Sequence, residues 1–397
     1  MSFGQECCEA DDLWQESWAV SDARTQHAVG NGSQSFASLF VQEPPGEVLR
    51  RIEAIVSCLV ESLAQGVLPE IEIPLRASGI SSQRHLQAVG DEQNAVHYRN
   101  ISLISRQGES AFRYTRIVKL LQVVHELVRS GRQAPQRDIY YQLKSPPLFA
   151  SPSHVNVAIQ DVVALLQVPR SGLGICCSSR GLVAGRLQLQ EHEGGPWLDC
   201  HAATRAIPGD CAAIQRFRFQ SDARFIVVLE KDAVFQRLAE ERFSEATDSI
   251  LVTAKGMPDL ATRFFLKGLT SAFPHMHLTA VVDWNPSGVA ILNTYKQSSC
   301  CMGVEVALPS ISWLAMHAAM LAGLPESAFQ PLTDRDRSLI RSLKSGVLRN
   351  QPEWLQEVEA MEEAHVKAEI EAAYRAQGFG AFARCLACCL IQEQWLQ

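Results

Sequence analysis

Two carboxylates and an amide stand directly after apolar runs in the second half of the chain. Glu230 follows the run 225–229, and Asp283 and Asn285 follow the run 278–282. Ligands of open parallel sheets bind outside the carboxyl ends of the strands, so both exits would project oxygen ligands into one crevice. Hard cations such as Mg²⁺ take oxygen ligands and keep several waters, which suits this set. Acids at strand ends also commonly cap helices, and the residue types alone leave both interpretations open.

These polar positions lie in a region where strand and helix patterns alternate, from Ala223 onward. The apolar runs that predict strands are 225–229, 250–253 and 278–282, and the helical patterns cover 231–243, 259–273 and 287–295. Strands alternating with helices predict a parallel sheet with helices packed on its faces. Neither G-x-G-x-x-G after the first strand nor G-x-x-x-x-G-K-S/T anywhere occurs, which disfavours dinucleotide and P-loop nucleotide sites.

A different set of patterns precedes this region. Amphipathic helices are predicted at 48–63, 110–130 and 155–166, and short strands are predicted at 173–177 and 182–189, on either side of the turn SSRG. Two helices followed by a β-hairpin are typical of a winged helix, a variant of the DNA-binding helix-turn-helix. Residues 66–108 are irregular and are interpreted as loops around weak strands.

Charge is unevenly distributed along the chain. The formal net charge is −7, yet residues 106–186 carry eleven Lys or Arg against four acids, a local net of +7. Residues 1–50 contribute −6 and residues 351–397 contribute −5. A basic middle between acidic ends is a plausible footprint for a polyanion, and a solvated basic face explains it equally well. Residues 1–46, rich in Ser, Gln, Gly and acids, are interpreted as a disordered acidic tail.

The composition excludes several classes of protein. No uninterrupted apolar run reaches the roughly 18 residues that a membrane span needs, and the N-terminus has no basic region followed by an apolar run, as a secretory signal would. Twelve cysteines in 397 residues are too dilute for a disulfide scaffold. We therefore expect no membrane partner and a reducing compartment, the cytosol or the nucleus.

Within the basic segment, the sequence RDIYY (137–141) places two tyrosines side by side. We expect this segment to be an apolar strand, and a tyrosine in such a strand is usually a core residue. Residue type alone therefore gives neither Tyr140 nor Tyr141 a chemical role.

Six sequence blocks, taken together and in order, resemble those of one known family. The blocks are RDIYY (137–141), SSRGLVAG (178–185), VLEKDAVFQRL (228–238), KGMPDLATR (255–263), VDWNPSGVAILNTYK (282–296) and PLTDRD (331–336). In these blocks the chain resembles the Spo-eleven family of meiotic double-strand-break transesterases, relatives of the A subunit of topoisomerase VI. The resemblance runs from about Val48 to the C-terminus and is weakest at 66–108.

The resemblance implies a multidomain fold of the α+β and α/β classes. A winged-helix (CAP-like) DNA-binding domain with a nucleophilic tyrosine would occupy residues 47–210. A Toprim α/β domain with a parallel sheet and a divalent metal would occupy 215–330, and 331–397 would be a helical extension of it. Both domains agree with the element patterns.

The resemblance also implies roles for individual residues. Tyr141, the second aromatic of its block, matches the family's nucleophile, and Arg137 matches an arginine that can stabilise the phenolate or contact the scissile phosphate. A tyrosyl hydroxyl with a pKa near ~10 needs such help at neutral pH. Glu230 and Asp283 match the Toprim carboxylates that hold Mg²⁺, which would neutralise charge developing on the phosphate.

Three further positions complete the expected site. Asn285 would be a third oxygen ligand, although the common motif has a second aspartate there, and this departure puts a second metal ion in doubt. Arg180 stands where many members carry a lysine and is expected to contact DNA, as is Lys255.

The function implied is formation of meiotic double-strand breaks by tyrosine transesterification, through a covalent phosphotyrosyl–DNA intermediate. The expected partners are double-stranded DNA, a second copy of the chain sharing composite active sites, an ATPase-type subunit like topoisomerase VI B, and other meiotic break factors in the nucleus. Two alternatives stay open: a topoisomerase VI-type A subunit that reseals the break, and a catalytically silent DNA-binding scaffold.

Overall fold

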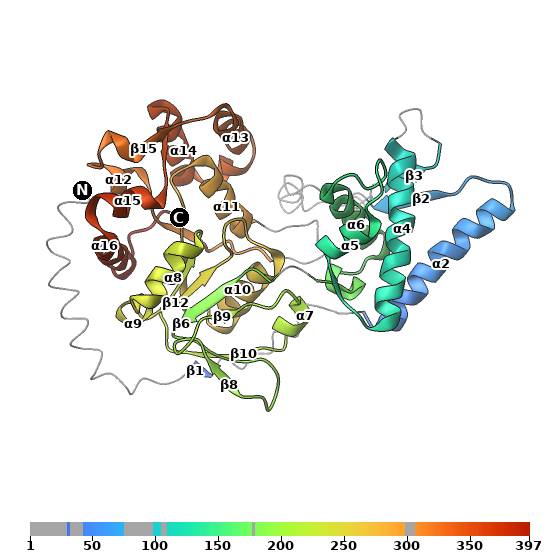
Figure 1. Cartoon of the computed structure of the whole chain (residues 1–397), viewed down its shortest axis with the longest axis horizontal. Helices are drawn as coiled ribbons and strands as arrows, with labels where there is room; N and C mark the ends of the chain where they lie inside the picture. Colours follow the sequence, from blue (N-terminus) through green and yellow to red (C-terminus); the bar gives the residue numbers. More distant parts are fainter. Residues whose placement is uncertain (1–29, 32–42, 75–97, 105–108, 177–178, 298–305) are drawn as a thin grey trace, which may run out of the picture.

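The described chain forms two lobes, each with its own hydrophobic core (Figure 1). The computed structural model describes residues 30–31, 43–74, 98–104, 109–176, 179–297 and 306–397. Buried side chains from Val48 to Ile175 make the core of the N-terminal lobe, and those from Val183 to Leu390 make the core of the C-terminal lobe. The two cores therefore separate between Ile175 and Val183, whereas the sequence placed a domain boundary near 210–215.

Helices dominate the N-terminal lobe. Its elements are α2 (Pro45–Ala64), β2 (Glu70–Pro74), β3 (Tyr98–Ser102), α4 (Glu109–Ser130), β4 (Ala134–Pro135), α5 (Gln136–Leu143), α6 (Pro152–Leu166), a 3-10 helix (Arg170–Leu173) and β5 (Ile175–Cys176). The helices expected from the apolar stripes are confirmed as α2, α4 and α6, and the weak strands as β2 and β3. On α4, Ile117, Leu120 and Val124 are fully buried, because positions three to four apart share one helix face.

A six-stranded mixed sheet is the centre of the C-terminal lobe. The elements up to this sheet's last strand are β6 (Leu182–Gly185), β7 (Gln188–Gln190), β8 (Trp197–Asp199), β9 (Arg205–Ala206), α7 (Cys211–Ile214), β10 (Arg218–Ser221), β11 (Phe225–Leu229), α8 (Asp232–Glu240), α9 (Phe243–Ala246), β12 (Ser249–Thr253), α10 (Leu260–Ala272), β13 (His277–Val281), α11 (Pro286–Lys296) and β14 (Ser312–Ala315). The strand order is β14-β13-β11-β12-β6-β9. Strands β11 to β14 pair in parallel, which confirms the predicted parallel sheet.

The β-hairpin expected at 173–189 does not form. Strand β6 pairs antiparallel with β12 and β9, in the sheet of the C-terminal lobe, whereas β5 pairs in parallel with β4 in the N-terminal lobe. The prediction was wrong because two short apolar runs near a turn do not reveal which strand each will meet. One partner of β6, β12, lies more than sixty residues further along the chain, and Val183 and Ala184 of β6 are buried.

The C-terminal extension packs onto the sheet of the same lobe. Its elements are α12 (Ala318–Leu321), a 3-10 helix (Glu326–Ala328), β15 (Phe329–Pro331), α13 (Asp334–Ser345), a 3-10 helix (Val347–Asn350), α14 (Pro352–Ala364), β16 (Val366–Ala368), α15 (Ile370–Gln377) and α16 (Phe379–Ile391). The bridge between Trp284 and Ala368 fixes this segment beside the exit of β13.

Most of the predicted acidic tail lies outside the described residues. The exception is β1 (Gly30–Asn31), which pairs antiparallel with β10 in a second, four-stranded sheet of order β1-β10-β7-β8. Across the described ranges, no helix has the length and apolar character needed to cross a membrane.

Candidate active site

Tyr141 is exposed on the short helix α5 and touches Arg137. The segment is a helix and not the expected apolar strand, so residues four apart share a face. Arg137 Nη2 donates a hydrogen bond to Tyr141 Oη at 3.3 Å, and the guanidinium carbon lies 5.6 Å from the centre of the ring. Tyr141 is 56% exposed, so its hydroxyl is open to a ligand. A guanidinium at this position can also bind an oxygen of a phosphate that reaches the hydroxyl.

Tyr140 faces the opposite way. It is 9% exposed, its ring lies 5.5 Å from that of Tyr141 between centroids, and its hydroxyl donates to the carbonyl of Ala150 at 3.3 Å. With Ile139 also buried, α5 turns one face into the core and presents Tyr141 on the other. Of the two tyrosines, only Tyr141 has its hydroxyl on the surface beside an arginine.

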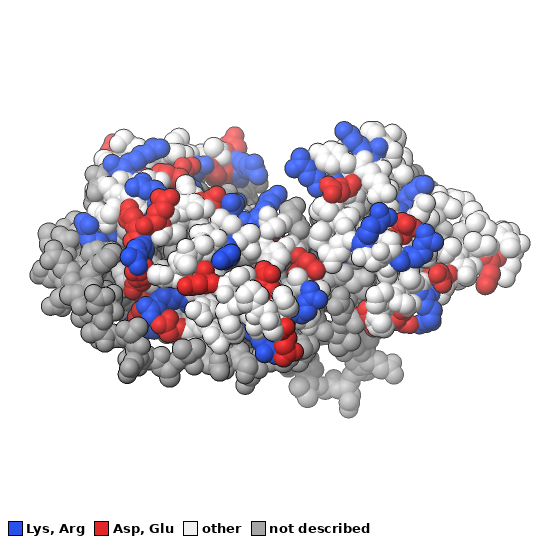
Figure 2. All heavy atoms as spheres, turned by 60° about the horizontal axis from the view of Figure 1, so that its bottom comes forward, with Lys and Arg blue, Asp and Glu red and all other residues white. Residues whose placement is uncertain are grey.

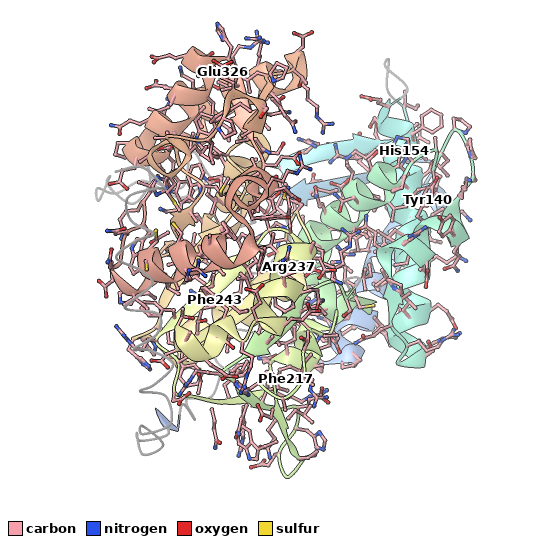
Figure 3. The ribbon with its side chains drawn as sticks, turned by 60° about the vertical axis from the view of Figure 1, so that its left-hand side comes forward. Tyr140, His154, Phe217, Arg237, Phe243 and Glu326 are labelled. Carbon is pink, nitrogen blue, oxygen red and sulfur yellow. The ribbon has the colours of Figure 1, made fainter. Side chains whose placement is uncertain are left out.

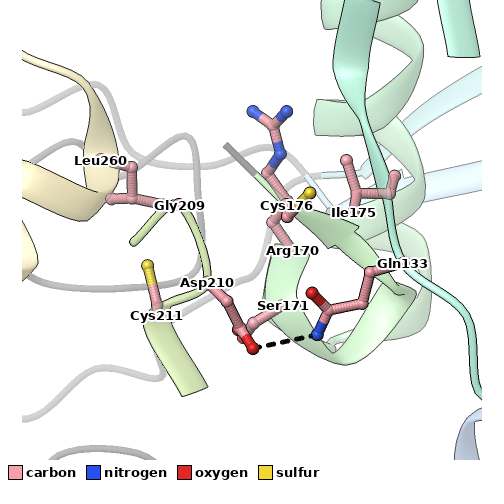
Figure 4. A pocket seen from close by; sticks show the side chains of 9 residues that line it. All are labelled: Gln133, Arg170, Ser171, Ile175, Cys176, Gly209, Asp210, Cys211 and Leu260. Atoms are coloured by element: carbon pink, nitrogen blue, oxygen red, sulfur yellow. Dashed lines mark hydrogen bonds between the residues drawn. The ribbon is translucent and has the colours of Figure 1, made fainter. Parts of the chain in front are cut away.

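The N-terminus of α5 is held near the junction of the two lobes. Buried Arg170 donates from Nη2 to Gln136 Oε1 at 3.1 Å. Next to it, Gln133 Nε2 donates to Asp210 Oδ2 at 3.1 Å, a contact from the N-terminal to the C-terminal lobe (Figure 4). The pocket around these residues has a volume of about 10 Å³, enough for one water, so we regard it as a packing feature.

The carboxylates of Glu230 and Asp283 come together at the carboxyl ends of β11 and β13. These strands are neighbours in parallel, so their exits meet at one edge of the sheet. Glu230 Oε2 accepts the N–H of Asp283 at 2.9 Å, and Asp283 Oδ1 accepts the N–H of Ile370 at 2.8 Å. Gly288 is needed at the start of α11, because any Cβ there would collide with the Asp283 carbonyl. The expected meeting of the two acids is confirmed.

Both carboxyl groups hold their protons more tightly than usual. Burial raises the pKa of Glu230 to about 7, and the nearby charge of Asp283 adds to this shift. Burial also raises the pKa of Asp283. Two acids that are largely shielded from water and repel each other favour any arrangement that supplies positive charge between them. Such a pair fits a divalent cation.

This pair predicts a pH-dependent stability for the metal-free protein. Between the ordinary pKa of Glu230, 4.5, and about 7, the folded state binds more protons than the unfolded state. The free energy of unfolding should therefore fall as pH rises through this window, by on the order of 2 kcal/mol. Chemical denaturation with EDTA at pH 5.5 and pH 8 measures it. Glu230→Gln should lose this component, and an unchanged pH dependence in that variant would contradict the assignment.

Asn285 lies beside Asp283 but uses its carbonyl oxygen as a helix cap. Asn285 Oδ1 accepts the N–H of Gly288 at 2.7 Å at the N-terminus of α11, and its Nδ2 donates to Asp283 Oδ2 at 3.4 Å. The sequence left two roles open for a polar residue at a strand exit, helix cap and metal ligand. Asn285 caps a helix, and it also lies next to the carboxylate pair. Its role as a metal ligand stays a prediction.

Two carboxylates are enough to hold the divalent cation that the sequence predicts. Within the part of the chain that is described, no group of three His, Cys, Asp or Glu side chains is arranged to hold a metal ion. Magnesium commonly binds through one or two carboxylates, keeps several waters, and takes further oxygens from phosphates of the substrate. Glu230 and Asp283, both oxygen donors and largely buried, fit that mode of binding.

The two expected DNA-contacting cations are both exposed on the C-terminal lobe. Arg180 lies in the segment that leads into β6, and the next residue, Gly181, packs so closely on Thr262 that a Cβ would not fit. Lys255 has a positive φ of 58° and pairs with Asp232 at 3.1 Å. The segment with Arg180 therefore lies against the start of α10. The first residues of α10 belong to the same sequence block as Lys255, KGMPDLATR (255–263). The sequence predicted that Arg180 lies in the turn of a β-hairpin, the wing of a winged helix. This prediction was wrong, because the two strands belong to different lobes.

Four of the eleven basic side chains of residues 106–186 form ion pairs within the described part of the chain. Arg113 pairs with Asp161, Arg129 and Arg132 with Glu126, and Arg186 with Asp222 and Asp248. Figure 2 accordingly shows basic and acidic side chains interspersed over both lobes on that face. Glu126 and Asp161 are already included in the local net charge of +7, so only the pairing of Arg186 with Asp222 and Asp248, outside the segment, lowers it further. Lys119, Arg137, Lys144 and Arg180 stay exposed.

Sequence reasoning missed three charged residues around Asp283. The Lys231 Nζ is 3.1 Å from Asp283 Oδ1 and 3.6 Å from Glu369 Oε2, and it also forms an ion pair with Glu371. Lys231 could have been suspected because it directly follows Glu230. The two glutamates lie about 140 residues further on, and no spacing in the sequence indicates this contact.

Comparisons with known proteins match both lobes to known domain families. A family model described as the Toprim domain of Spo11 and the topoisomerase 6 A subunit matches residues 225–379, which include both carboxylates. Another, described as type IIB DNA topoisomerase, matches 112–175, which include Tyr141. A meiotic recombination protein SPO11-2 of Oryza sativa subsp. indica is 37% identical over 364 residues, which cover 89% of this chain and 94% of the relative.

More distant relatives belong to the same two groups. The meiotic recombination protein SPO11 of Homo sapiens is 34% identical over 334 residues, covering 82% of this chain and 83% of the relative. The DNA topoisomerase 6 A subunit of Arabidopsis thaliana is 30% identical over 335 residues, covering 82% of this chain and 76% of the relative. With two matching domain models and relatives across most of its length, the chain belongs to the family of SPO11 meiotic recombination proteins and topoisomerase VI A subunits.

Proposed function

We propose that this protein forms double-strand breaks in DNA at the start of meiotic recombination, by transesterification at Tyr141. The observation that supports it most is the exposed hydroxyl of Tyr141, held by Arg137 on a helix whose neighbouring tyrosine is buried. The similarity to meiotic recombination proteins over most of both chains supports the meiotic role. Detection of a phosphotyrosyl link between Tyr141 and a DNA 5′ end would test it directly.

The chemistry follows from the groups that the chain supplies. Tyr141 Oη attacks a backbone phosphate, a bond from phosphorus to the tyrosyl oxygen forms, and the bond to the neighbouring sugar oxygen breaks. Tyr141 gives up its proton to water, and the leaving sugar oxygen takes up a proton to become a free hydroxyl, so one phosphotyrosyl ester replaces one sugar–phosphate ester of the DNA. Arg137 stabilises the phenolate before attack and contacts the phosphate during it, since a guanidinium matches phosphate oxygens well. Exposed Arg180 and Lys255 contact the DNA backbone.

Glu230 and Asp283 would hold Mg²⁺, with Asn285 beside them. When bound, such an ion offsets the negative charge that develops on the phosphate and the leaving oxygen. The backbone N–H groups of Asp283 and Ile370 hold the two carboxylates in place, so the pair would hold the ion at a defined position. We also propose that the N-terminal lobe is a winged-helix domain that binds DNA.

We propose that the active site is assembled from two copies of the chain, and the positions of these groups in different lobes support this. Tyr140, next to the nucleophile, is in the N-terminal lobe, well apart from Arg237 on α8, the helix that follows Glu230 (Figure 3). A tyrosine and a carboxylate pair in different lobes can serve one phosphate if a second copy supplies one of them. Each copy then cuts one strand, and two copies cut both.

Mixed dimers test this arrangement. Dimers of one chain with Tyr141→Phe and one with Glu230→Gln keep one composite site that has both a tyrosine and an intact carboxylate pair. We expect these dimers to nick one strand of a plasmid, while each variant alone should leave it intact. Purification through two different affinity tags isolates the mixed dimer. Complete loss of nicking in that preparation would show that each site is contained in one chain.

The remaining partners follow from the family. Relatives named as A subunits of DNA topoisomerase 6 point to a second, B-type subunit, and we propose an ATPase-type partner together with other meiotic break factors in the nucleus. Resealing by a topoisomerase VI-type A subunit is the second candidate, because relatives of that kind are also similar. Relaxation of supercoiled DNA that needs ATP and a B-type partner would favour resealing over break formation.

A further inference from the structure

Lys231 inserts a positive charge into the acidic edge of the sheet. Its Nζ is 3.1 Å from Asp283 Oδ1 and 3.6 Å from Glu369 Oε2, and it donates a hydrogen bond to Glu371. The side chains of Lys231 and Asp283 are 21% and 6% exposed, so water screens this pair only weakly. In the absence of a metal ion, the ammonium group is therefore the cation that balances Asp283.

The two glutamates come from the C-terminal extension. Glu369 is the N-cap residue of α15 and Glu371 lies in its first turn. Between them, Ile370 donates its N–H to Asp283 Oδ1 at 2.8 Å, so three consecutive residues contact either Asp283 or Lys231. This tripeptide lies against the exit of β13, where Trp284 also bridges Ala368. Tertiary packing thus supplies Lys231 with partners other than Asp283.

The geometry points to Lys231 as the residue that sets the affinity of the carboxylate pair for its divalent ion, with Glu371 as its positioning residue. This inference rests on the proposed metal site. Asp283 Oδ1 already accepts from a backbone N–H and from the ammonium group, so an ion that approaches it competes with Lys231. The four-carbon stem of lysine lets the ammonium group move toward Glu371, which keeps it paired when Asp283 turns to the ion.

Calorimetric titration of the EDTA-treated full chain with Mn²⁺, without DNA, tests this assignment. A charge within about 4–6 Å changes the proton affinity of a carboxylate by roughly 1–3 pKa units, so we expect an effect of at least about tenfold on metal binding. Lys231→Met should bind Mn²⁺ about tenfold more tightly. Glu371→Gln should bind it several-fold more weakly, because Lys231 then has fewer partners besides Asp283. Exposed Glu363 on α14 provides the control, and Glu363→Gln should bind like the parent chain.

Two further variants separate this mechanism from general electrostatics. Lys231→Arg keeps the cation and should not tighten binding, and an increase equal to that of Lys231→Met would overturn the inference. In the Lys231→Met background, the effect of Glu371→Gln should shrink at least about threefold, because its partner is gone. The same loss of affinity in both backgrounds would show that Glu371 acts on the ion directly, which also overturns the inference.

Thermal unfolding and Mn²⁺ titration distinguish a variant that misfolds from a proposed metal site that does not exist. Thermal unfolding in EDTA and in Mn²⁺ reports folding of each variant, and the increase in Tm caused by Mn²⁺ should be larger for Lys231→Met than for the parent chain. If Mn²⁺ binding is lost in Asp283→Asn but is unchanged in the Lys231 variants, the proposed metal site is supported and the role of Lys231 is refuted. A parent chain that binds no Mn²⁺ at all would refute both.

Discussion

Tyr141→Phe should abolish covalent attachment of the protein to DNA and leave its affinity for DNA nearly unchanged. The substitution removes only the hydroxyl that accepts a hydrogen bond from Arg137, and the ring stays in place against Tyr140. Tyr141 is 56% exposed, so no buried polar group loses a partner and the fold should keep its stability. Denaturing gels of DNA–protein adducts measure attachment, and fluorescence anisotropy measures affinity.

Tyr140→Phe is the matched control, because it makes the same chemical change one residue away. Its hydroxyl donates to Ala150 from a largely buried position, so its loss should cost about 1 kcal/mol of stability and leave most of the cleavage activity. Attachment that persists in Tyr141→Phe and disappears in Tyr140→Phe would shift the nucleophile by one residue. Attachment lost in neither variant would place it elsewhere.

Asp283→Asn should weaken Mg²⁺ binding by at least about a hundredfold, since even changes to residues behind a metal ligand cost roughly 10- to 100-fold. Asp283 and Glu230 are the two carboxylates proposed to bind the ion, and the substitution leaves only Glu230 of that pair. The amide oxygen of an asparagine can still accept the N–H of Ile370, so the fold should survive. Titration with Mg²⁺, followed by DNA cleavage and by the increase in Tm, measures the loss.

Asn285→Asp should act in the opposite direction, tightening Mg²⁺ binding by up to roughly tenfold, about 1.4 kcal/mol. The new carboxylate replaces the amide that donates to Asp283 at 3.4 Å, so without metal the two acids repel and the protein should be less stable. Aspartate caps helices as well as asparagine does, which keeps α11 in place. If the metal dependence is unchanged here but lost in Asp283→Asn, residue 285 is not a ligand and only Glu230 and Asp283 remain.

The sequence by itself determined the strands and helices whose patterns are local. The runs that became β11, β12 and β13 are largely apolar because parallel strands are covered on both faces, and these runs placed Glu230 and Asp283 at strand exits. The long helices α2 and α4 were equally readable, since their stripes extend over several turns. The blocks that resemble a known family then identified Tyr141 as the candidate nucleophile.

Only the tertiary structure decided the elements and contacts that depend on distant segments. RDIYY is too short for its period to distinguish strand from helix, and packing of Ile139 and Tyr140 against the core made it α5. β6 does not form the expected hairpin, because it pairs over four residues with β12 in the buried sheet of the C-terminal lobe. The ion pairs of Lys231 with Asp283 and Glu371 join residues that lie up to 140 positions apart. Periodicity describes which face of an element is apolar, but charge pairing between elements is settled only by how they pack.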